Sequence, residues 1–133
     1  MTIVGNKDTL SFEIADQYDG GLLQVDIWAG GRLLTVRDNM AYVSAFIYSL
    51  NWEKEKIEKR EIDDDFIFFD HGPTTDSFSS RIKIEGCEAS ISFETEDEEF
   101  YISMPLKTLI DHLKEVINIL TKKEHIQAER VNG

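Results

Sequence analysis

The sequence predicts an α+β fold in which a largely antiparallel sheet of about six to seven strands is covered on one face by two helices. Three observations lead to this fold class. Several short segments alternate apolar and polar residues, as strands with one wet face do. Glycine-containing turns of hairpin length separate some of them. Two further segments carry apolar residues at helical spacing, and such one-sided helices bury their apolar stripe against a sheet.

Three strands are expected before the first helix. Residues 9–16 alternate in polarity, and residues 22–28 repeat the pattern, which places Trp28 on the outer face of its strand. Gly30-Gly31 predicts a tight hairpin turn, because only glycine adopts a positive φ at low cost at both positions. Residues 32–36 then form the return strand.

The first helix is expected to begin after Asp38, whose carboxylate is free to accept backbone N–H bonds in the first turn. An apolar face follows at helical spacing, made of Met40, Val43, Phe46, Ile47 and Leu50. The helix is expected to end near Asn51. The charged residues 53–61 that follow are open to two interpretations, a frayed helical turn or an edge strand.

The second half of the chain is expected to form three or four strands, at residues 66–69, 79–85, 89–94 and 100–104. Within 89–94 apolar and polar residues alternate without exception, which indicates a half-buried strand. His71-Gly72-Pro73 is expected to end the strand before it in the chain, and the acidic residues 94–99 are expected to form a hairpin loop.

The second helix is expected to begin at Pro105, because the first turn of a helix tolerates proline. Its apolar stripe runs unbroken over four turns, through Leu106, Leu109, Ile110, Leu113, Val116, Ile117 and Leu120. The length of the chain is typical of one domain. We therefore expect residues 1–133 to form a single domain with loose ends at about 1–7 and 127–133.

Acidic charge dominates the composition. The 133 residues contain 26 Asp and Glu against 14 Lys and Arg, a net charge of -12. Much of the excess lies in two runs, residues 61–65 and 94–99. Such a charge disfavours nucleic acid and membrane surfaces as partners, and it favours basic proteins.

Cysteine usage and the absence of targeting patterns predict a cytoplasmic protein. Cys87 is the only cysteine, so no intramolecular disulfide forms. No signal-peptide pattern and no apolar run of bilayer-spanning length is recognisable. Glu85 and Glu88 beside Cys87 disfavour a reactive thiolate, so we interpret this cysteine as inert.

A metal or acid–base site is the first catalytic candidate. Carboxylates and imidazoles bind divalent metals, and five such residues lie close together in the sequence: Asp63, Asp64, Asp65, Asp70 and His71. Their spacing matches no metal-binding loop, and the pair His112 and Glu115 lacks a second histidine. We therefore expect no metal, no cofactor and no catalytic residue, and interpret these side chains as solvated surface groups.

Outward-facing aromatic residues are better candidates for function. Trp28 and Tyr101 are predicted on the outer side of strands, beside Asp26, Ser90, Ser92, Glu94 and Ser103. Aromatic side chains flanked by carboxylates are typical of a binding patch for a basic partner. The alternative is that a loop covers this face, or that Trp28 packs locally at the end of its hairpin.

Two segments resemble the small immunity proteins of bacterial polymorphic and contact-dependent growth inhibition toxin systems. The first is Leu23–Val36, LQVDIWAGGRLLTV, continuing into the first helix. The second, CEASISFE at residues 87–94 before the closing amphipathic helix, is similar to the cell-wall-associated toxin immunity family. The likeness extends over roughly residues 9–120 and consists of element order, size and acidity. Where that group commonly has Gly-His-Val, this sequence has Gly86-Cys87-Glu88.

The resemblance implies a cytoplasmic, non-enzymatic protein that binds one cognate toxin domain and blocks its active site or an essential surface. Many such toxins are nucleases with basic clefts, where the carboxylates of an acidic inhibitor would take the place of phosphates. The predicted contacts are acidic residues that pair with toxin Lys or Arg, and two aromatic anchors: Asp63, Asp64, Asp65, Glu96, Asp97, Glu98, Trp28 and Tyr101.

Two alternatives stay open at this point. One is a structural or adaptor subunit, such as a homodimer that uses the open sheet face or an edge strand. The other is a metal-dependent enzyme that uses Asp70, His71 and the neighbouring aspartates.

Overall fold

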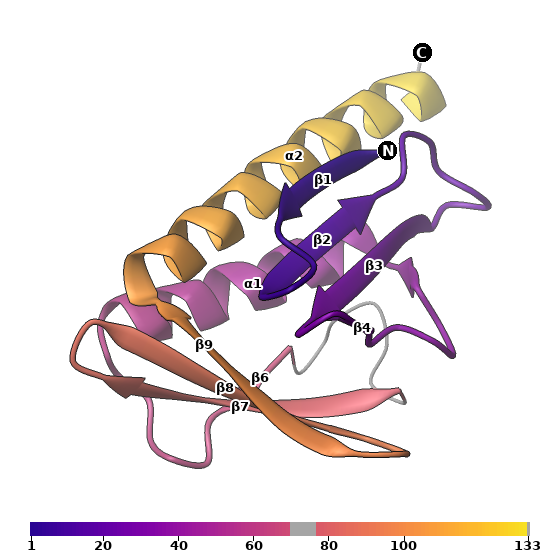
Figure 1. Ribbon diagram of the computed structural model, residues 1–133. Coiled ribbons are helices and arrows are strands. Elements are labelled where there is room, and N and C mark those ends of the chain that lie inside the picture. Colours follow the sequence, from indigo (N-terminus) through magenta and orange to yellow (C-terminus); the bar gives the residue numbers. More distant parts are fainter. Residues whose placement is uncertain (70–76, 133) are drawn as a thin grey trace.

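The computed structural model describes residues 1–69 and 77–132, and it contains two helices and two antiparallel sheets (Figure 1). The predicted α+β class with antiparallel strands is confirmed. In chain order the elements are β1 (Thr2–Gly5), β2 (Leu10–Ile14), β3 (Leu23–Ala29), β4 (Arg32–Leu33), β5 (Met40–Ala41), α1 (Val43–Glu58), β6 (Ile67–Phe68), β7 (Phe78–Glu85), β8 (Glu88–Thr95), β9 (Glu99–Pro105) and α2 (Leu106–Asn132).

The strands divide between two sheets instead of forming one. The first sheet has the order β1-β2-β3-β4, with β5 also paired to β3, and the second has the order β6-β7-β8-β9. Helix α1 separates the strands of the two sheets in the chain. After this helix, β7 pairs with β8 and β8 pairs with β9. Each sheet is therefore built from strands that are neighbours in sequence.

The two helices pack against each other in opposite directions, and α2 spans both sheets (Figure 1). Near the start of α1, Ser44 donates a hydrogen bond to Glu124 of α2 at 2.5 Å. Near the end of α1, Glu58 lies 3.7 Å from the ammonium group of Lys114. Along its inner side α2 contacts β1, β8 and β9, and its fully buried residues belong to the predicted stripe: Leu109, Leu113, Val116 and Leu120. Within the described residues neither helix has an apolar stretch that would cross a membrane.

A chain of phenylalanines joins the two sheets through a common core. Phe12 of the first sheet meets the ring of Phe69 at 5.7 Å between centroids, edge to face. Phe69 in turn meets Phe78 of the second sheet at 6.2 Å, and Phe78 meets Phe93 at 6.2 Å. Aromatic pairs in these arrangements stabilise a core beyond the area that they bury. The two sheets therefore share one hydrophobic core.

Both predicted ends of the first helix are wrong. The helix begins at Val43 after Tyr42, and no side chain caps it. The Asp38 carboxylate instead accepts the backbone N–H of Met40 at 2.9 Å, which forms a turn before β5. At the other end the helix continues through Asn51 to Glu58, because Glu53 and Ile57 extend its buried face by two more turns.

An ion pair on the surface of α1 supports this extension. The Lys54 ammonium group lies 2.7 Å from the Glu58 carboxylate one turn later. This hydrogen bond holds the pKa of Glu58 below its usual value. Oppositely charged pairs at this spacing stabilise helices, although Lys before Glu is the less favourable order. Residues 53–58 are helical, and are neither a frayed turn nor an edge strand.

The ends of the chain and two strand boundaries also differ from expectation. Residues 2–5 form β1, since Val4 is buried beside β2, and α2 continues to Asn132 through residues with good helix propensity. The return strand β4 covers only Arg32–Leu33. The strand expected at 66–69 shortens to Ile67–Phe68, and the left-handed φ of 59° at Phe69 ends it. The expected break at His71-Gly72-Pro73 lies outside the described residues.

A buried carboxylate holds Phe69 in this conformation. Glu53 of α1 is 1 % exposed and accepts hydrogen bonds from the Ser49 hydroxyl at 2.7 Å and from the backbone N–H of Phe69 at 2.5 Å. A left-handed backbone costs a non-glycine residue about 1–2 kcal/mol. The bond to Glu53 and the packing of the ring on both sheets offset this cost.

We therefore expect Glu53→Ala to lower the free energy of unfolding by about 1.5–3 kcal/mol, because it leaves the buried N–H of Phe69 without this charged acceptor. Urea unfolding followed by circular dichroism measures the change. Glu53→Gln retains one acceptor oxygen and serves as the control with a smaller loss. An alanine variant as stable as wild type would show that the carboxylate does not support the chain at Phe69.

Candidate functional site

One face of the second sheet is an open polar surface. Successive residues of a strand point to opposite sides, and in β7 to β9 one set is buried: Ser80, Ile82, Ala89, Ile91, Phe93, Ile102 and Met104. The other set points away from the core. We call this second set the outer face: Ile67, Ser79, Arg81, Lys83, Ser90, Ser92, Glu94, Glu99, Tyr101 and Ser103.

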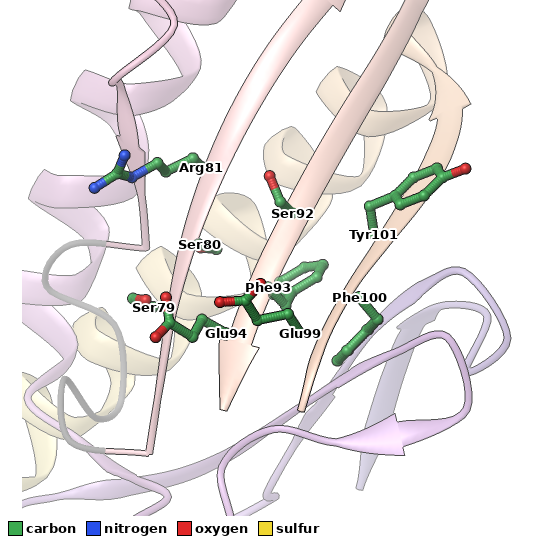
Figure 2. Close-up of a pocket in the computed structure, with 9 residues that line it drawn as sticks. All are labelled: Ser79, Ser80, Arg81, Ser92, Phe93, Glu94, Glu99, Phe100 and Tyr101. Atoms are coloured by element: carbon green, nitrogen blue, oxygen red, sulfur yellow. The ribbon is translucent and has the colours of Figure 1, made fainter. Parts of the chain in front are cut away.

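The register of the strands arranges these side chains in rows (Figure 2). One row crosses all four strands and contains Ile67, Arg81, Ser92 and Tyr101. The next row, toward the β8–β9 turn, contains Ser79, Glu94 and Glu99. The row on the other side contains Lys83, Ser90 and Ser103. Ser92 thus stands between Arg81 and Tyr101, and the small serine side chains in the three rows leave the larger groups accessible.

Tyr101 is the aromatic group of this face. Its side chain is 73 % exposed and, among the described residues, makes no ring contact. Together with parts of β7 and β8 it borders an open depression of about 490 Å³, whose lining includes Arg81, Ser92, Glu94 and Glu99. A tyrosine that stands clear of its neighbours supplies a rigid contact area with a polar tip.

Two like charges face each other at one end of this depression. Glu94 of β8 is the cross-strand partner of Glu99 of β9. Within the described residues neither carboxylate forms an ion pair. The basic groups of the same face do have partners, since Arg81 lies 3.5 Å from Asp65 and Lys83 lies 3.6 Å from Glu85. The uncompensated charge of the outer face is therefore negative.

Two carboxylates of the second acidic run, Glu96 and Glu98, make structural contacts. Arg32 lies 2.5 Å from Glu98 and stacks on the ring of Phe100 at 4.0 Å, and Arg37 pairs with Glu96. These pairs join the β3–β4 side of the first sheet to the β8–β9 turn of the second. Asp97, at the tip of the turn, is without a partner in the described part of the chain.

The first acidic run lies at the opposite end of the second sheet. The Asp63 carboxylate accepts the backbone N–H of Asp65 at 3.0 Å, so it shapes its own loop. Asp63 and Asp64 border a small depression of about 130 Å³ together with Lys83 and Ile84. The β8–β9 turn begins after Thr95, which pairs with Phe78 at the opposite end of β7. The two acidic runs therefore do not form one patch.

Trp28 lies on the first sheet, apart from Tyr101. Its indole ring is covered by the ammonium group of Lys7 at 4.3 Å, and the same ammonium lies 3.0 Å from Glu13. Lys7 comes from the connection between β1 and β2, so a loop covers this tryptophan, which is one of the alternatives that the sequence left open. The structure thus separates the two predicted aromatic anchors, and the binding role of each stays a prediction.

Sequence reasoning found part of the outer face. The alternation along the strands predicted that Ser90, Ser92, Glu94 and Ser103 point outward with Tyr101. It missed Glu99, which was assigned to a loop, and Ile67, whose strand pairs with Arg81. The signal for Glu99 is its spacing of two residues from Tyr101, which places both on one side of a strand.

Potential metal ligands do not cluster in the described residues. Within 1–69 and 77–132 no three His, Cys, Asp or Glu side chains gather to hold a metal ion, and Cys87 lies exposed in the β7–β8 turn. Asp70 and His71 fall outside this part of the chain. A second depression, of about 530 Å³, contains the hydrogen-bonded pair Ser44 and Glu124 but no histidine. Burial and the Glu124 carboxylate raise the pKa of the nearby Tyr18 phenol.

Comparison with known proteins identifies a structural relative and no relative by sequence. No protein-family model matches the chain, and no curated protein matches it. The crystal structure of CdiI from Burkholderia dolosa superposes with a TM-score of 0.61, covering 88 % of this chain and 99 % of that chain at 9 % sequence identity. The predicted resemblance to immunity proteins of contact-dependent growth inhibition systems is therefore confirmed at the level of the fold.

We expect the double replacement Glu94→Gln and Glu99→Gln to stabilise the fold. Like charges directly opposite each other on adjacent strands are destabilising, and removing this pair should gain about 0.2–0.5 kcal/mol at low salt. Thermal unfolding at low and high ionic strength measures the effect, which salt should reduce because both groups are exposed. A double variant less stable than wild type would indicate that the carboxylates make stabilising contacts.

Proposed function

We propose that this protein binds a cognate bacterial toxin domain and neutralises it without catalysis. The observation that carries the proposal is the fold shared with CdiI from Burkholderia dolosa over almost the whole of both chains. An immunity protein acts by occupying an active site or an essential surface of its toxin, so it needs a binding surface and no catalytic group of its own. The open outer face of the second sheet supplies such a surface.

The partner of this protein is a basic toxin domain, and a nuclease fits best. The chain carries a net charge of -12. A nuclease cleft is basic because it binds phosphates. An acidic inhibitor is attracted by the same positive potential and competes with the nucleic acid for the cleft. Complementary charge also raises the association rate, which favours capture of toxin in the cytoplasm before it acts.

Purification followed by a growth assay tests this function. Tagged protein is recovered from lysate of its source organism, eluted with rising salt, and the co-purified proteins are identified by mass spectrometry. The candidate toxin domain is then expressed alone and together with this chain. We expect the domain alone to arrest growth and co-expression to restore it. A domain that remains toxic in the presence of this chain would contradict the proposal.

Surface charge is expected to control the speed of association. Asp64 and Asp97 make no ion pair in the described structure, so Asp64→Lys with Asp97→Lys changes the field without breaking a contact. We expect about a tenfold slower association at low salt and a weaker salt dependence. Stopped-flow or surface plasmon resonance kinetics with the toxin domain measures both.

Asp111 and Glu115 of α2 provide the matched control. Both are exposed, and the described residues contain no ion partner for either. Their double replacement by lysine makes the same change in net charge on another surface. If both double variants slow association equally, overall charge and not its position decides the rate. If neither does, the electrostatic account is wrong.

A homodimeric adaptor is the second candidate. The outer face carries Glu94 and Glu99 at one end and Lys83 toward the other. A two-fold axis through the face would place opposite charges together, as isologous interfaces require. Light scattering over a concentration range tests this candidate, and a monomer at every concentration excludes it.

A further inference from the structure

We infer that the outer face of the second sheet is the surface that docks the toxin domain, with Glu94 and Glu99 jointly receiving one guanidinium group of that domain beside the ring of Tyr101. This inference rests on the proposed function and specifies its interface. It adds Glu94 and Glu99 to the contact residues that the sequence predicted. It gives Glu96 and Glu98 of the β8–β9 turn a structural role.

The first reason is that Asp26 and Trp28, on the outer side of the first sheet, already make contacts within the molecule, although the buried Ser11 Oγ and Trp28 Nε1 have no hydrogen-bond partner in the described residues. On its outer side the Asp26 carboxylate accepts hydrogen bonds from Thr35 at 2.7 Å and from Asn39 at 3.1 Å. Lys7 covers Trp28 there. A partner that docked on this side would have to displace internal contacts. On the second sheet Tyr101, Glu94 and Glu99 are exposed and make no ion pair or ring contact in the described residues, so a partner can contact them without displacing such a contact.

The second reason is the charge balance of the outer face. Glu94 and Glu99 stand opposite each other without a basic partner in the described residues, while Arg81 and Lys83 have partners. Directly opposed residues on antiparallel strands have Cα atoms about 4.5–5.5 Å apart. A planar guanidinium group reaches two carboxylates at such a spacing and relieves their mutual repulsion. A basic partner is therefore the complement of this face.

The third reason is the aromatic group beside the two carboxylates. Tyr101 lies two residues after Glu99 on the same strand, so both side chains point to the same side. Its exposed ring can pack against the apolar stem or the charged plane of an arginine. The surrounding serines can adapt their hydrogen bonds to the partner. Tyrosine beside uncompensated acid is a combination that binding hot spots favour.

The acidic runs have another role under this inference. Glu96 and Glu98 are held by Arg37 and Arg32, so they keep the β8–β9 turn against the first sheet. Their field still guides a basic partner toward the neighbouring carboxylates. Changes at the other carboxylates of the two runs should therefore act on the association rate, whereas changes in Glu94, Glu99 and Tyr101 should act on dissociation.

Binding kinetics with the toxin domain from the growth assay test the inference. We expect Glu94→Gln with Glu99→Gln to weaken binding at least 30-fold, and Tyr101→Ala at least tenfold, mostly through faster dissociation. Thermal unfolding shows whether each variant is folded, and the glutamine pair is expected to be at least as stable as wild type. Loss of binding with retained stability cannot come from unfolding.

Matched controls separate this face from general effects. Asp111→Asn with Glu115→Gln removes two neighbouring acidic charges from α2, and Tyr48→Ala removes a side chain of 74 % exposure from α1. Both control variants should bind within about twofold of wild type. Equal losses in control and outer-face variants would overturn the inference.

The outcomes distinguish the inference from the function on which it rests. If wild-type protein neutralises the toxin domain and the outer-face variants bind as tightly as wild type, the surface is wrong and the function stands. If wild-type protein fails to neutralise the domain, the proposed function fails and the inference with it. If Tyr101→Ala instead converts a dimer into a monomer, the outer face joins two copies and the inference is overturned.

Discussion

The contact between the Glu53 carboxylate and the backbone of Phe69 is the constraint on which the arrangement of the two sheets depends. It fixes the end of β6 to α1 and holds Phe69 in a left-handed conformation. From that position the ring packs on Phe12 of one sheet and on Phe78 of the other. Phe69 thus contributes to a continuous core, together with α2, which contacts strands of both sheets.

Ion pairs between the sheets explain why a count of acidic residues does not locate a binding site. The residues of the 94–99 run divide into two groups with different surroundings. Glu96 and Glu98 meet arginines of the first sheet, whereas Glu94 and Glu99 face each other on the outer side of the second. The first pair stabilises the turn. The second pair has no basic partner in the described residues, so a basic group of a partner protein can compensate its charge.

The negative charge of the outer face lowers the stability of the second sheet. Opposed carboxylates destabilise neighbouring strands, and a tyrosine that stands in solvent adds nothing to the core. Departures from locally optimal sequence are expected at functional sites, where binding and not folding selects the residue. Glu94 and Glu99 link the stability of the fold to the proposed docking surface, because the same two side chains weaken the fold and serve the docking.

The sequence alone determined the α+β class, the antiparallel hairpins, the buried stripe of α2 and the outward direction of Tyr101, because alternation and helical spacing are local patterns. The tertiary structure decided the division into two sheets, the extension of α1 to Glu58 and the cover of Trp28 by Lys7. It also decided which carboxylates are paired. These features depend on strand register and on contacts between distant residues, which a period of two or 3.6 residues does not encode.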